Sequence, residues 1–514
     1  MRTDLNPRIY PDTEHWLYRR QFILGPRPFD KFEHWKRAKL GHDLFLACHP
    51  DLMLTRAGAG NLEMVVLGYL LDPYDPSLND RQIAEKIVNE CGSLEDIPGK
   101  LSPVGGRYAI VVRQGEMIRI FGDCAGFRQI FFLKEDECPL WCSSQPALLS
   151  EVVPIEEDKA VWQDLADLPM FKNTTEYWFP GNRTVMKNVF HLRPNHYLDL
   201  RTGETVRYWP RDRISRYSVE ECAKKACAVL QGLLECATKR FDVALGITAG
   251  LDTRVLLAAS KGVAERVYFF THTHARLDEN GADIRVPREI LTRFGLRHHL
   301  VVNENPMDKD FERIFRKNVT AARTRIGLNA RAILNHFSGL RKTPLVVNGV
   351  CGEITRNFYS FPKWYPWKGK SLATLARMPG SRIAGEEFEN WLATARASDS
   401  CGIGLLDLFY WENRNANWSA MSYSEYDIAF ESLSPFNCRL LIETMLGVDK
   451  KHRRMPGFEL HRQLIRRMWP ELLEYEINPP ANGTERVLQR LRGTRFYDVL
   501  RFLKFLHRHY SHNG

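Results

Sequence analysis

The sequence predicts an α+β unit of short strands followed by an α/β unit built on a parallel sheet, with a helical C-terminal extension. The chain has 514 residues, which is too long for one core when a domain usually takes about 100–200 residues. In the first 200 residues short apolar runs are bounded by Gly, Asp or Pro, which is typical of strands joined by turns. After residue 217 apolar strands alternate with helical segments, the pattern of a parallel sheet covered by helices.

The first unit is predicted to contain strands rich in β-branched and aromatic residues, interrupted by one helix at 80–91. The sequence changes character at 210–217, where we place the boundary between units of residues 1–210 and 215–514. Examples of the predicted strands of the first unit are 63–71, 107–112, 117–121, 130–133 and 140–144.

The second unit begins with a predicted helix at 218–238, where Ser218 and Glu221 have the spacing of a capping box. Four apolar runs follow, each beside a helical segment, and they are predicted to be the strands of the parallel sheet. These runs are 242–247, 267–270, 300–302 and 345–347.

Composition indicates a globular protein, with 44% hydrophobic and 26% charged residues. No apolar run approaches the roughly 18 residues that a transmembrane helix needs, and the polar start lacks a secretory signal, so a cytoplasmic location is expected. The net charge of +10 favours anionic partners such as ATP, acidic substrates, nucleic acid or an anionic membrane. The eleven cysteines lack paired zinc-ligand spacing and are expected to be small buried residues.

Much of the positive charge lies near the C-terminus, interleaved with apolar residues in the pattern of a basic amphipathic helix. We interpret this segment mainly as a terminal helix that packs on its own domain and exposes a basic face. A peripheral membrane contact or a protein contact is the alternative. The basic residues are Arg486, Arg490, Arg492, Arg495, Arg501, Lys504 and Arg508.

The most informative segment joins the strand at 242–247 to the helix that follows it. A turn of small residues leads straight into a helix, so backbone N–H groups and the positive helix end point to one place, which suits phosphate. Gly250 allows close approach of the backbone, and the Asp252 carboxylate can hold Mg²⁺. The candidate nucleotide-binding residues are Thr248, Ala249, Gly250, Leu251, Asp252 and Thr253.

This loop has neither the Gly-Lys-Ser/Thr of a Walker loop nor a GxGxxG turn. It resembles the Ser-Gly-Gly-x-Asp-Ser loop of N-type ATP pyrophosphatases, with Thr248, Ala249 and Thr253 at the three positions that differ. The resemblance implies a cradle for the pyrophosphate that ATP releases when it adenylates a substrate. The alternative is a βα turn with incidental residues.

Other segments resemble the asparagine synthetase family, in order and over nearly the whole chain. The resemblance implies an inactive class II glutamine amidotransferase-like domain of Ntn-hydrolase-like fold over 1–210. For 215–514 it implies an asparagine-synthetase-like ATP-pyrophosphatase domain of Rossmann-like fold (adenine nucleotide alpha hydrolase-like, or PP-loop). The matching segments are 106–110, 122–126, 142–149, 192–198, 294–299 and 434–440, with Thr184 and Asp283.

Three departures from the family pattern bear on the reaction. The family's glutaminase uses an N-terminal cysteine, whereas residue 2 is Arg2 and the first cysteine is Cys48. Cleavage that exposes Cys48 is an alternative, but His49-Pro50 does not resemble the opening strand of the family. We therefore expect the glutaminase to be inactive.

The second departure lies at 346–356, which resembles the family's Ser-Gly-x-Gly-Ser-Asp-Glu segment but is one residue shorter and lacks the Asp. The resemblance makes Gly349 a phosphate contact, Glu353 a catalytic and metal-binding carboxylate, and Arg356 a phosphate clamp. A structural Glu at a helix start is the alternative for Glu353.

The third departure concerns a lysine that the family places after its late helix to stabilise the transition state. Residues 469–479 contain no lysine. Lys450 and Lys451 are the candidate substitutes.

Together these residues predict an ATP- and Mg²⁺-dependent ligase that adenylates a carboxylate and transfers the acyl group to an amine, without its own glutaminase. Glutaminase-less relatives such as β-lactam synthetases and lasso-peptide cyclases work in this way. The substrate is expected to be an anionic small molecule or peptide, and no nucleic acid is expected. The alternatives are an asparagine synthetase fed with ammonia or by a partner, and an inactive pseudo-ligase that binds a nucleotide or a partner.

Two pairs of histidines suggest a metal site as a further alternative. His272 and His274 alternate along a predicted strand, and His298 and His299 are adjacent. A pair at i and i+2 can chelate zinc. We favour structural roles in the strands of the second unit for all four.

Overall fold

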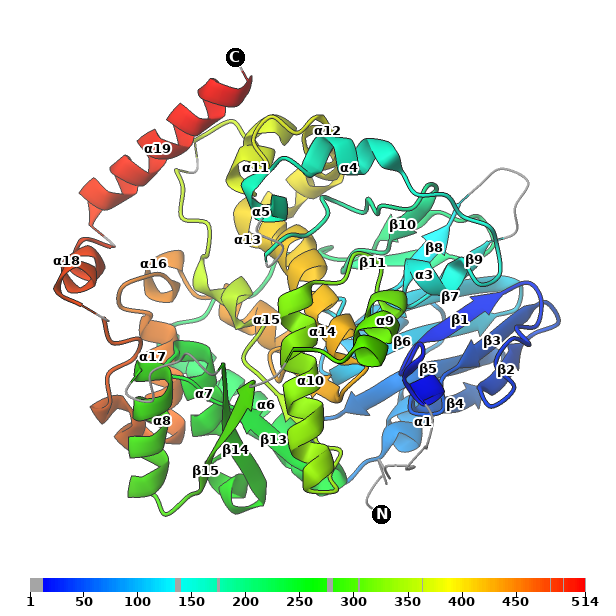
Figure 1. Cartoon of the computed structure of the whole chain (residues 1–514), viewed down its shortest axis with the longest axis horizontal. Helices are drawn as coiled ribbons and strands as arrows, with labels where there is room; N and C mark the ends of the chain where they lie inside the picture. Colours follow the sequence, from blue (N-terminus) through cyan, green and yellow to red (C-terminus); the bar gives the residue numbers. More distant parts are fainter. Residues whose placement is uncertain are drawn as a thin grey trace.

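The computed structural model describes residues 13–134, 140–172, 176–274, 281–303, 306–362, 364–480, 482–492 and 494–513. Two six-stranded antiparallel sheets form the first half, and a five-stranded parallel sheet surrounded by helices forms the second (Figure 1). The fold class expected from the sequence is therefore confirmed, including the helices at the C-terminus.

The first antiparallel sheet has the strand order β10-β8-β9-β1-β3-β2, and the second has the order β12-β11-β7-β6-β5-β4. In the first sheet the strands are β1 (Phe22–Gly25), β2 (Lys36–Leu40), β3 (Leu44–Cys48), β8 (Phe131–Leu133), β9 (Trp141–Ser143) and β10 (Val189–His191). In the second they are β4 (Leu54–Ala59), β5 (Leu62–Leu71), β6 (Gly105–Gln114), β7 (Met117–Gly122), β11 (His196–Asp199) and β12 (Thr205–Arg207).

The period-two alternation of strand side chains divides the first half into layers. Phe22 and Leu24 of β1 point into the space between the sheets, where they share a core with Val65 of β5 and Val111 of β6. Ile23, between them, points to the opposite face and joins a separate cluster. The helices of this half are η1 (Thr13–Trp16), α1 (Asp80–Glu90), α2 (Ile97–Leu101), α3 (Pro146–Leu149), α4 (Lys159–Leu165) and α5 (Pro169–Lys172). Of these, α1 packs on β4 and β5 and α3 packs on β8 and β9, whereas α4 contacts α12 (Arg382–Ala395) of the second half.

All five strands of the third sheet run parallel, in the order β15-β14-β13-β16-β17. The chain starts in the middle at β13, adds strands toward one edge, and then returns to the other side of β13. Because the order reverses between β13 and β16, the crevice at their carboxyl ends is the usual ligand site of such a sheet. The strands are β13 (Val243–Gly246), β14 (Val267–His274), β15 (His298–Asn303), β16 (Leu345–Val347) and β17 (Glu431–Leu433).

Helices flank this sheet, and the first of them begins with the predicted capping box. Ser218 Oγ accepts from the Glu221 amide at 3.2 Å, and Glu221 accepts from the Ser218 amide at 2.9 Å. The helices up to η3 are α6 (Val219–Arg240), α7 (Leu251–Ala259), η2 (Lys261–Arg266), α8 (Ala282–Arg293), α9 (Lys309–Asn318), α10 (Thr324–Gly339) and η3 (Gly352–Arg356).

The rest of the chain is mostly helical, as predicted, apart from β17. Its helices are α11 (Gly369–Leu375), α12 (Arg382–Ala395), η4 (Arg396–Asp399), α13 (Leu405–Phe409), η5 (Tyr410–Ser419), α14 (Ala420–Tyr426), α15 (Arg439–Leu446), α16 (Lys450–Arg453), α17 (Glu459–Met468), η6 (Pro470–Glu474), α18 (Gly483–Leu491) and α19 (Arg495–Asn513). None of the helices in the described ranges is long and apolar enough to span a bilayer.

A long helix interrupted by a π-helical segment, η5, ties the second half to the first. π-Helical hydrogen bonding is rare and turns side chains into positions that a regular helix does not offer. Within η5, Glu412 accepts from the side chain of Asn195 at 2.7 Å, and Nδ2 of Asn417 donates to the carbonyl of Gly181 at 3.0 Å. The segment therefore contacts the sandwich through polar groups that are buried.

A buried network of charges also joins the halves. Arg107 of β6 donates to both carboxylate oxygens of Asp427, at 2.6 and 2.8 Å, and to Glu431 of β17 at 2.8 Å. Arg128 donates to Glu431 at 2.7 Å. No side chain of the four is more than 6% exposed, so each charge depends on the others for its stabilisation.

Candidate functional site

The predicted nucleotide loop lies at the carboxyl end of β13, and Gly250 is the residue before the first turn of α7. Thr248, Ala249 and Gly250 form the turn, and Leu251, Asp252 and Thr253 open the helix. Since no side chain in the described ranges caps this helix, its first N–H groups are available to an anion. The loop leaves the sheet at the point where the strand order reverses.

The second predicted segment follows β16, which pairs in parallel with β13, so the two segments leave the sheet side by side. Their contact is very close. A Cβ on Gly349 would lie 2.7 Å from Cβ of Asp252, and a Cβ on Gly352 would lie 2.8 Å from its Oδ1. Glycine is therefore required at both positions for η3 to approach the loop.

Between these glycines, Cys351 is buried and has a φ of 83°. This left-handed conformation is unusual for a residue with a side chain and is found mainly where surrounding structure imposes it. The strained turn directs η3 back toward the loop, so that Glu353 and Arg356 face Asp252.

Three charged side chains meet at this point. Arg356 Nη2 lies 2.9 Å from Oδ2 of Asp252 and 3.2 Å from Oε1 of Glu353. Oδ1 of Asp252 is buried and accepts no hydrogen bond from the described part of the chain. The structure thus brings together three residues that the sequence singled out separately, and leaves one carboxylate oxygen without a donor.

Burial raises the pKa of the Asp252 carboxyl to about 7, although the charge of Arg356 opposes the shift. For Arg356, burial works against the charged form, but the carboxylates of Asp252 and Glu353 outweigh it and raise the pKa of the guanidinium. A buried carboxylic acid that titrates near neutral pH is a frequent feature of functional sites.

The loop is held in shape by its own hydroxyl groups. Oγ1 of Thr253 accepts from the Thr248 amide at 3.3 Å and lies 3.2 Å from the Thr248 hydroxyl. The Gly250 amide donates to Oγ1 of Thr248 at 3.1 Å, and the Ala249 amide donates to Asp283 at 3.0 Å. A bound phosphate would replace some of these contacts, because the same amides and hydroxyls are its natural donors.

A third segment that reaches the loop was not recognised from the sequence as part of the site. The buried Arg254 of α7 donates to the carbonyls of Leu472 at 2.8 Å and Tyr475 at 3.2 Å. The Asn478 amide donates to the carbonyl of Ala249 at 2.9 Å. The segment after α17 thus lies against the loop at 248–253 and presents Asn478 to it. An arginine directly before the apolar run of α7 was the available signal.

Lys450 and Lys451 lie instead on the wall of a large cavity of about 910 Å³. Lys450 Nζ is 3.6 Å from Oδ2 of Asp407, and Arg453 is 3.1 Å from the same oxygen. Arg453 also donates to the carbonyl of Thr355 at 2.9 Å, which connects the cavity wall to η3. Its basic and aromatic lining includes Arg216, Tyr359, Phe361, Tyr365, Trp367, Arg396, Lys450, Lys451, Arg453 and Arg454.

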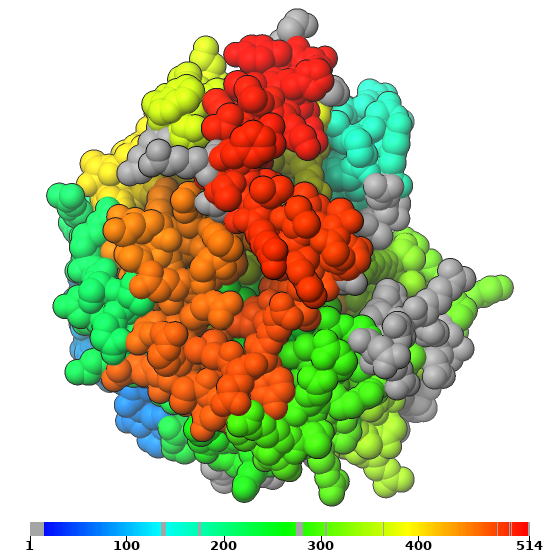
Figure 2. All heavy atoms as spheres, turned by 90° about the vertical axis from the view of Figure 1, so that its left-hand side faces the viewer, coloured from blue at the N-terminus to red at the C-terminus, as the bar shows by residue number. Residues whose placement is uncertain are grey.

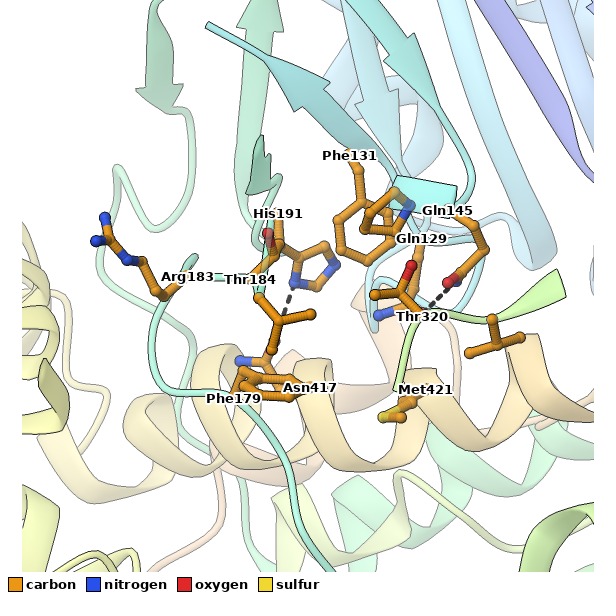
Figure 3. A pocket seen from close by; sticks show the side chains of 13 residues that line it. Gln129, Phe131, Gln145, Phe179, Arg183, Thr184, His191, Thr320, Asn417 and Met421 are labelled. Carbon is orange, nitrogen blue, oxygen red and sulfur yellow. Dashed lines mark hydrogen bonds between the residues drawn. The ribbon is translucent and has the colours of Figure 1, made fainter. Parts of the chain in front are cut away.

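A second, much smaller cavity of about 40 Å³ lies between the sandwich and the long interrupted helix (Figure 3). Gln145 donates to Gln129 at 3.1 Å, and His191 Nδ1 lies 3.1 Å from the side-chain oxygen of Asn417. Burial lowers the pKa of His191 to about 4, so the ring is neutral. The volume suits only a few water molecules.

Cys48, the first cysteine of the sequence, lies in β3, which is flanked by β1 and β2 in the sheet. It ends β3 and pairs with Phe22 of β1 and Lys36 of β2. Burial raises the pKa of its thiol to about 12, so the nucleophilic thiolate is strongly disfavoured. Cleavage that exposed Cys48 would remove β1, β2 and all of β3 except its last residue, which argues against that alternative.

The histidines of the parallel sheet have structural contacts. His298 Nε2 is 2.8 Å from the hydroxyl of Thr271, and burial lowers its pKa to about 4. His299 stacks on Tyr268 with ring centroids 4.0 Å apart. The side chain of His274 lies outside the described residues. Within the part of the chain that the structure describes, no three His, Cys, Asp or Glu residues form a metal-binding group.

The raised pKa of Asp252 predicts a pH dependence of nucleotide binding. The carboxylate, but not the carboxylic acid, attracts a cation, so Mg²⁺-ATP is expected to bind more tightly as pH rises through 7. Between pH 6 and 8 the dissociation constant should fall by roughly tenfold, in proportion to the ionised fraction. Calorimetric titration at saturating Mg²⁺ measures this change. Asp252→Asn should show a flat profile, and an equally steep profile in that variant would contradict the assignment.

No family model matches this chain, and neither does any curated protein. Matched structures include the glutamine phosphoribosylpyrophosphate amidotransferase of B. subtilis complexed with ADP and GMP, at 12% identity and a TM-score of 0.23, covering 66% of this chain and 72% of that one. The glutamine-dependent NAD⁺ synthetase of Acinetobacter baumannii in complex with ADP matches at 14% identity and a TM-score of 0.21, covering 41% and 44%.

An NH₃-dependent NAD synthetase of Campylobacter jejuni subsp. jejuni matches at 15% identity and a TM-score of 0.18, covering 28% of this chain and 62% of that one. These TM-scores are too low to place the chain in a family. Its function is therefore inferred from its own residues.

Proposed function

We propose that this protein is an ATP-dependent, AMP-forming ligase of asparagine-synthetase type that joins a carboxylate to an amine without a glutaminase of its own. The observation that supports this most directly is the convergence of Asp252, Glu353 and Arg356. They come from two segments at the carboxyl ends of neighbouring parallel strands, beside an uncapped helix start.

In the proposed reaction a substrate carboxylate oxygen attacks the α-phosphorus of ATP. The bond between the α-phosphorus and the bridging oxygen breaks, and pyrophosphate leaves from the side of the loop. The amides at the start of α7 and the hydroxyls of Thr248 and Thr253 would bind the departing pyrophosphate. An amine then attacks the acyl carbon, AMP leaves, and the amine loses a proton.

The residues present suit Mg²⁺. Among the residues that the structure describes, none donates to the buried Oδ1 of Asp252. The carboxylate of Glu353 lies nearby, since Arg356 contacts both carboxylates. Mg²⁺ in nucleotide sites is usually held by one or two carboxylates together with the phosphates and water. When bound, the ion would neutralise charge on the phosphates. Arg356 would then be released from Asp252 to pair with a phosphate oxygen.

The large basic cavity is the proposed site for an anionic substrate. It adjoins η3 through Asn357 and through Arg453, which bonds to Thr355. Six Lys or Arg residues line it against three Asp residues, and Asp407 is already paired with Arg453. The remaining positive charge suits a carboxylate or phosphate group, and the aromatic wall suits a planar or sugar ring.

Replacing Lys450 with Ala is predicted to raise the KM for the anionic substrate at least about tenfold with little change in kcat, because a hydrogen bond to a charged group contributes roughly 1.5–3 kcal/mol to binding. Steady-state kinetics measures both constants, with the substrate fraction that supports pyrophosphate release in a cell extract. Lys187→Ala, an exposed lysine paired with Glu156, is the matched control and should leave both unchanged. A fall in kcat alone would instead place Lys450 at the reacting atoms, as a substitute for the family lysine.

The test of the proposal is release of pyrophosphate and AMP from Mg²⁺-ATP with a cell extract as the substrate pool. Release that depends on a carboxylate fraction supports the ligase, and release that depends on aspartate and ammonia would identify an asparagine synthetase. Formation of ADP would contradict the proposed mechanism. Binding of Mg²⁺-ATP without turnover would favour a pseudo-ligase. The ion pair between Asp252 and Arg356 is compatible with either function.

A further inference from the structure

The two C-terminal helices expose an unusual number of apolar side chains. Eight of the 15 large hydrophobic residues that are exposed in the described ranges lie between 487 and 510. α18 has no buried residue at all. Figure 2 shows α18 and α19 as a continuous ridge on one face of the molecule. We define the C-terminal ridge by its exposed apolar residues Val487, Leu488, Leu491, Phe496, Val499, Leu500, Leu503 and Tyr510.

α19 has two apolar faces, and only one of them packs on the rest of the protein. Phe505 packs on Phe361, Tyr365 and Trp367 with ring centroids 5.2 to 5.6 Å apart, and Phe502 is 5.6 Å from Tyr365. This confirms that the helix packs on its own domain. The other face carries Phe496, Leu503 and Tyr510, which are 64%, 54% and 67% exposed. They are seven residues apart and so lie in line along the helix.

The ridge is also strongly basic. Between 482 and 511 there are seven Lys or Arg residues against two acidic ones. Arg486, Arg490 and Lys504 are exposed. Asp498 lies 3.4 Å from Arg454, on the body of the protein. The charge beside the exposed apolar face is therefore mainly positive.

From these observations we infer that the C-terminal ridge binds the surface of an anionic lipid bilayer. Exposed apolar residues flanked by Lys and Arg are the pattern of an interfacial helix, whose apolar face enters the acyl boundary while the basic groups meet lipid headgroups. Charged residues are depleted from the core of protein interfaces, whereas here they are interleaved with the apolar ones. Trp364, 73% exposed and 5.6 Å from Phe502, adds a side chain that favours the bilayer interface.

Co-sedimentation of the full chain with lipid vesicles tests the inference. Binding is expected to vesicles that contain phosphatidylserine, to be much weaker with phosphatidylcholine alone, and to weaken as salt is raised. The double variant Phe496→Ser/Leu503→Ser, and separately Arg490→Glu/Lys504→Glu, should each reduce binding at least tenfold. Val302→Ser/Leu340→Ser changes two exposed apolar residues elsewhere, 39% and 46% exposed, and should bind like the wild type.

Because all these side chains are exposed, the variants should keep the thermal unfolding midpoint of the wild type, which shows that they are folded. Failure of the wild type to bind phosphatidylserine vesicles at low salt would overturn the inference. The inference would also be overturned if the wild type did not bind vesicles but self-associated in analytical ultracentrifugation, and if Phe496→Ser/Leu503→Ser abolished that self-association. That result would make the ridge an interface between copies of the chain. The experiment is independent of ligase activity.

Discussion

Asp252→Asn is expected to reduce pyrophosphate release by roughly 10²–10³-fold, the effect usually seen when one group that stabilises developing charge is removed. The carboxylate is the only one in the first turn of α7, and its Oδ1 has no donor within the described residues. An amide at this position has the same shape but no charge, so it cannot neutralise a cation on the departing pyrophosphate.

The variant should remain folded, which separates this result from a loss of structure. Burial disfavours the ionised form of Asp252 and raises its pKa, so a neutral amide is tolerated there. Arg356 would keep its contact with Glu353 at 3.2 Å. The thermal midpoint is therefore expected to shift by only a few degrees, as a change of about 1 kcal/mol would produce.

Asp310→Asn is the matched control, because Asp310 also lies in the first turn of a helix, α9, but is exposed and pairs only weakly with Arg313 at 3.7 Å. It should leave pyrophosphate release unchanged. Full activity of Asp252→Asn would show that the loop does not act through its carboxylate, and the ligase proposal would lose its main support.

Arg107→Ala is predicted to destabilise the protein by about 3–5 kcal/mol, the cost usually measured when one member of a buried ion pair is removed. Arg107 holds Asp427 through two hydrogen bonds and Glu431 through a third. Its loss would leave two buried carboxylates with Arg128 as the remaining partner that both share. Urea unfolding monitored by circular dichroism measures the change in the free energy of unfolding.

Arg113→Ala supplies the control on the same strand. Arg113 is 22% exposed and lies 3.6 Å from Glu63, so its removal should cost only about 0–1 kcal/mol. Since the network joins β6 to β17, Arg107→Ala should also lower the cooperativity of unfolding between the two halves. Equal destabilisation by both variants would show that the buried network contributes no more than a surface pair.

Much of the fold was predictable because its signals are short in range. The strand at 345–347 was predicted with the bounds that β16 has, and the capping box of α6 was recognised from two residues. β2 is not among the predicted strands, for a physical reason. β2 reads Lys-Arg-Ala-Lys-Leu and is exposed at two of its first three positions, so its apolar content is too low to distinguish it from a loop. β17 was missed because it has only three residues, two of them polar.

By itself the sequence indicated short strands followed by a parallel sheet with helices, the strand–turn–helix loop at 248–253 and the segment at 348–356, since these depend on residues that are neighbours along the chain. Only the tertiary structure decided which side chains meet. Arg254 bonds to carbonyls more than 200 residues away, Arg356 pairs with Asp252, and Lys450 turns to the large cavity instead of the loop. Such contacts are set by how sheets and helices pack, because packing brings together residues whose separation along the chain carries no information about their distance in space.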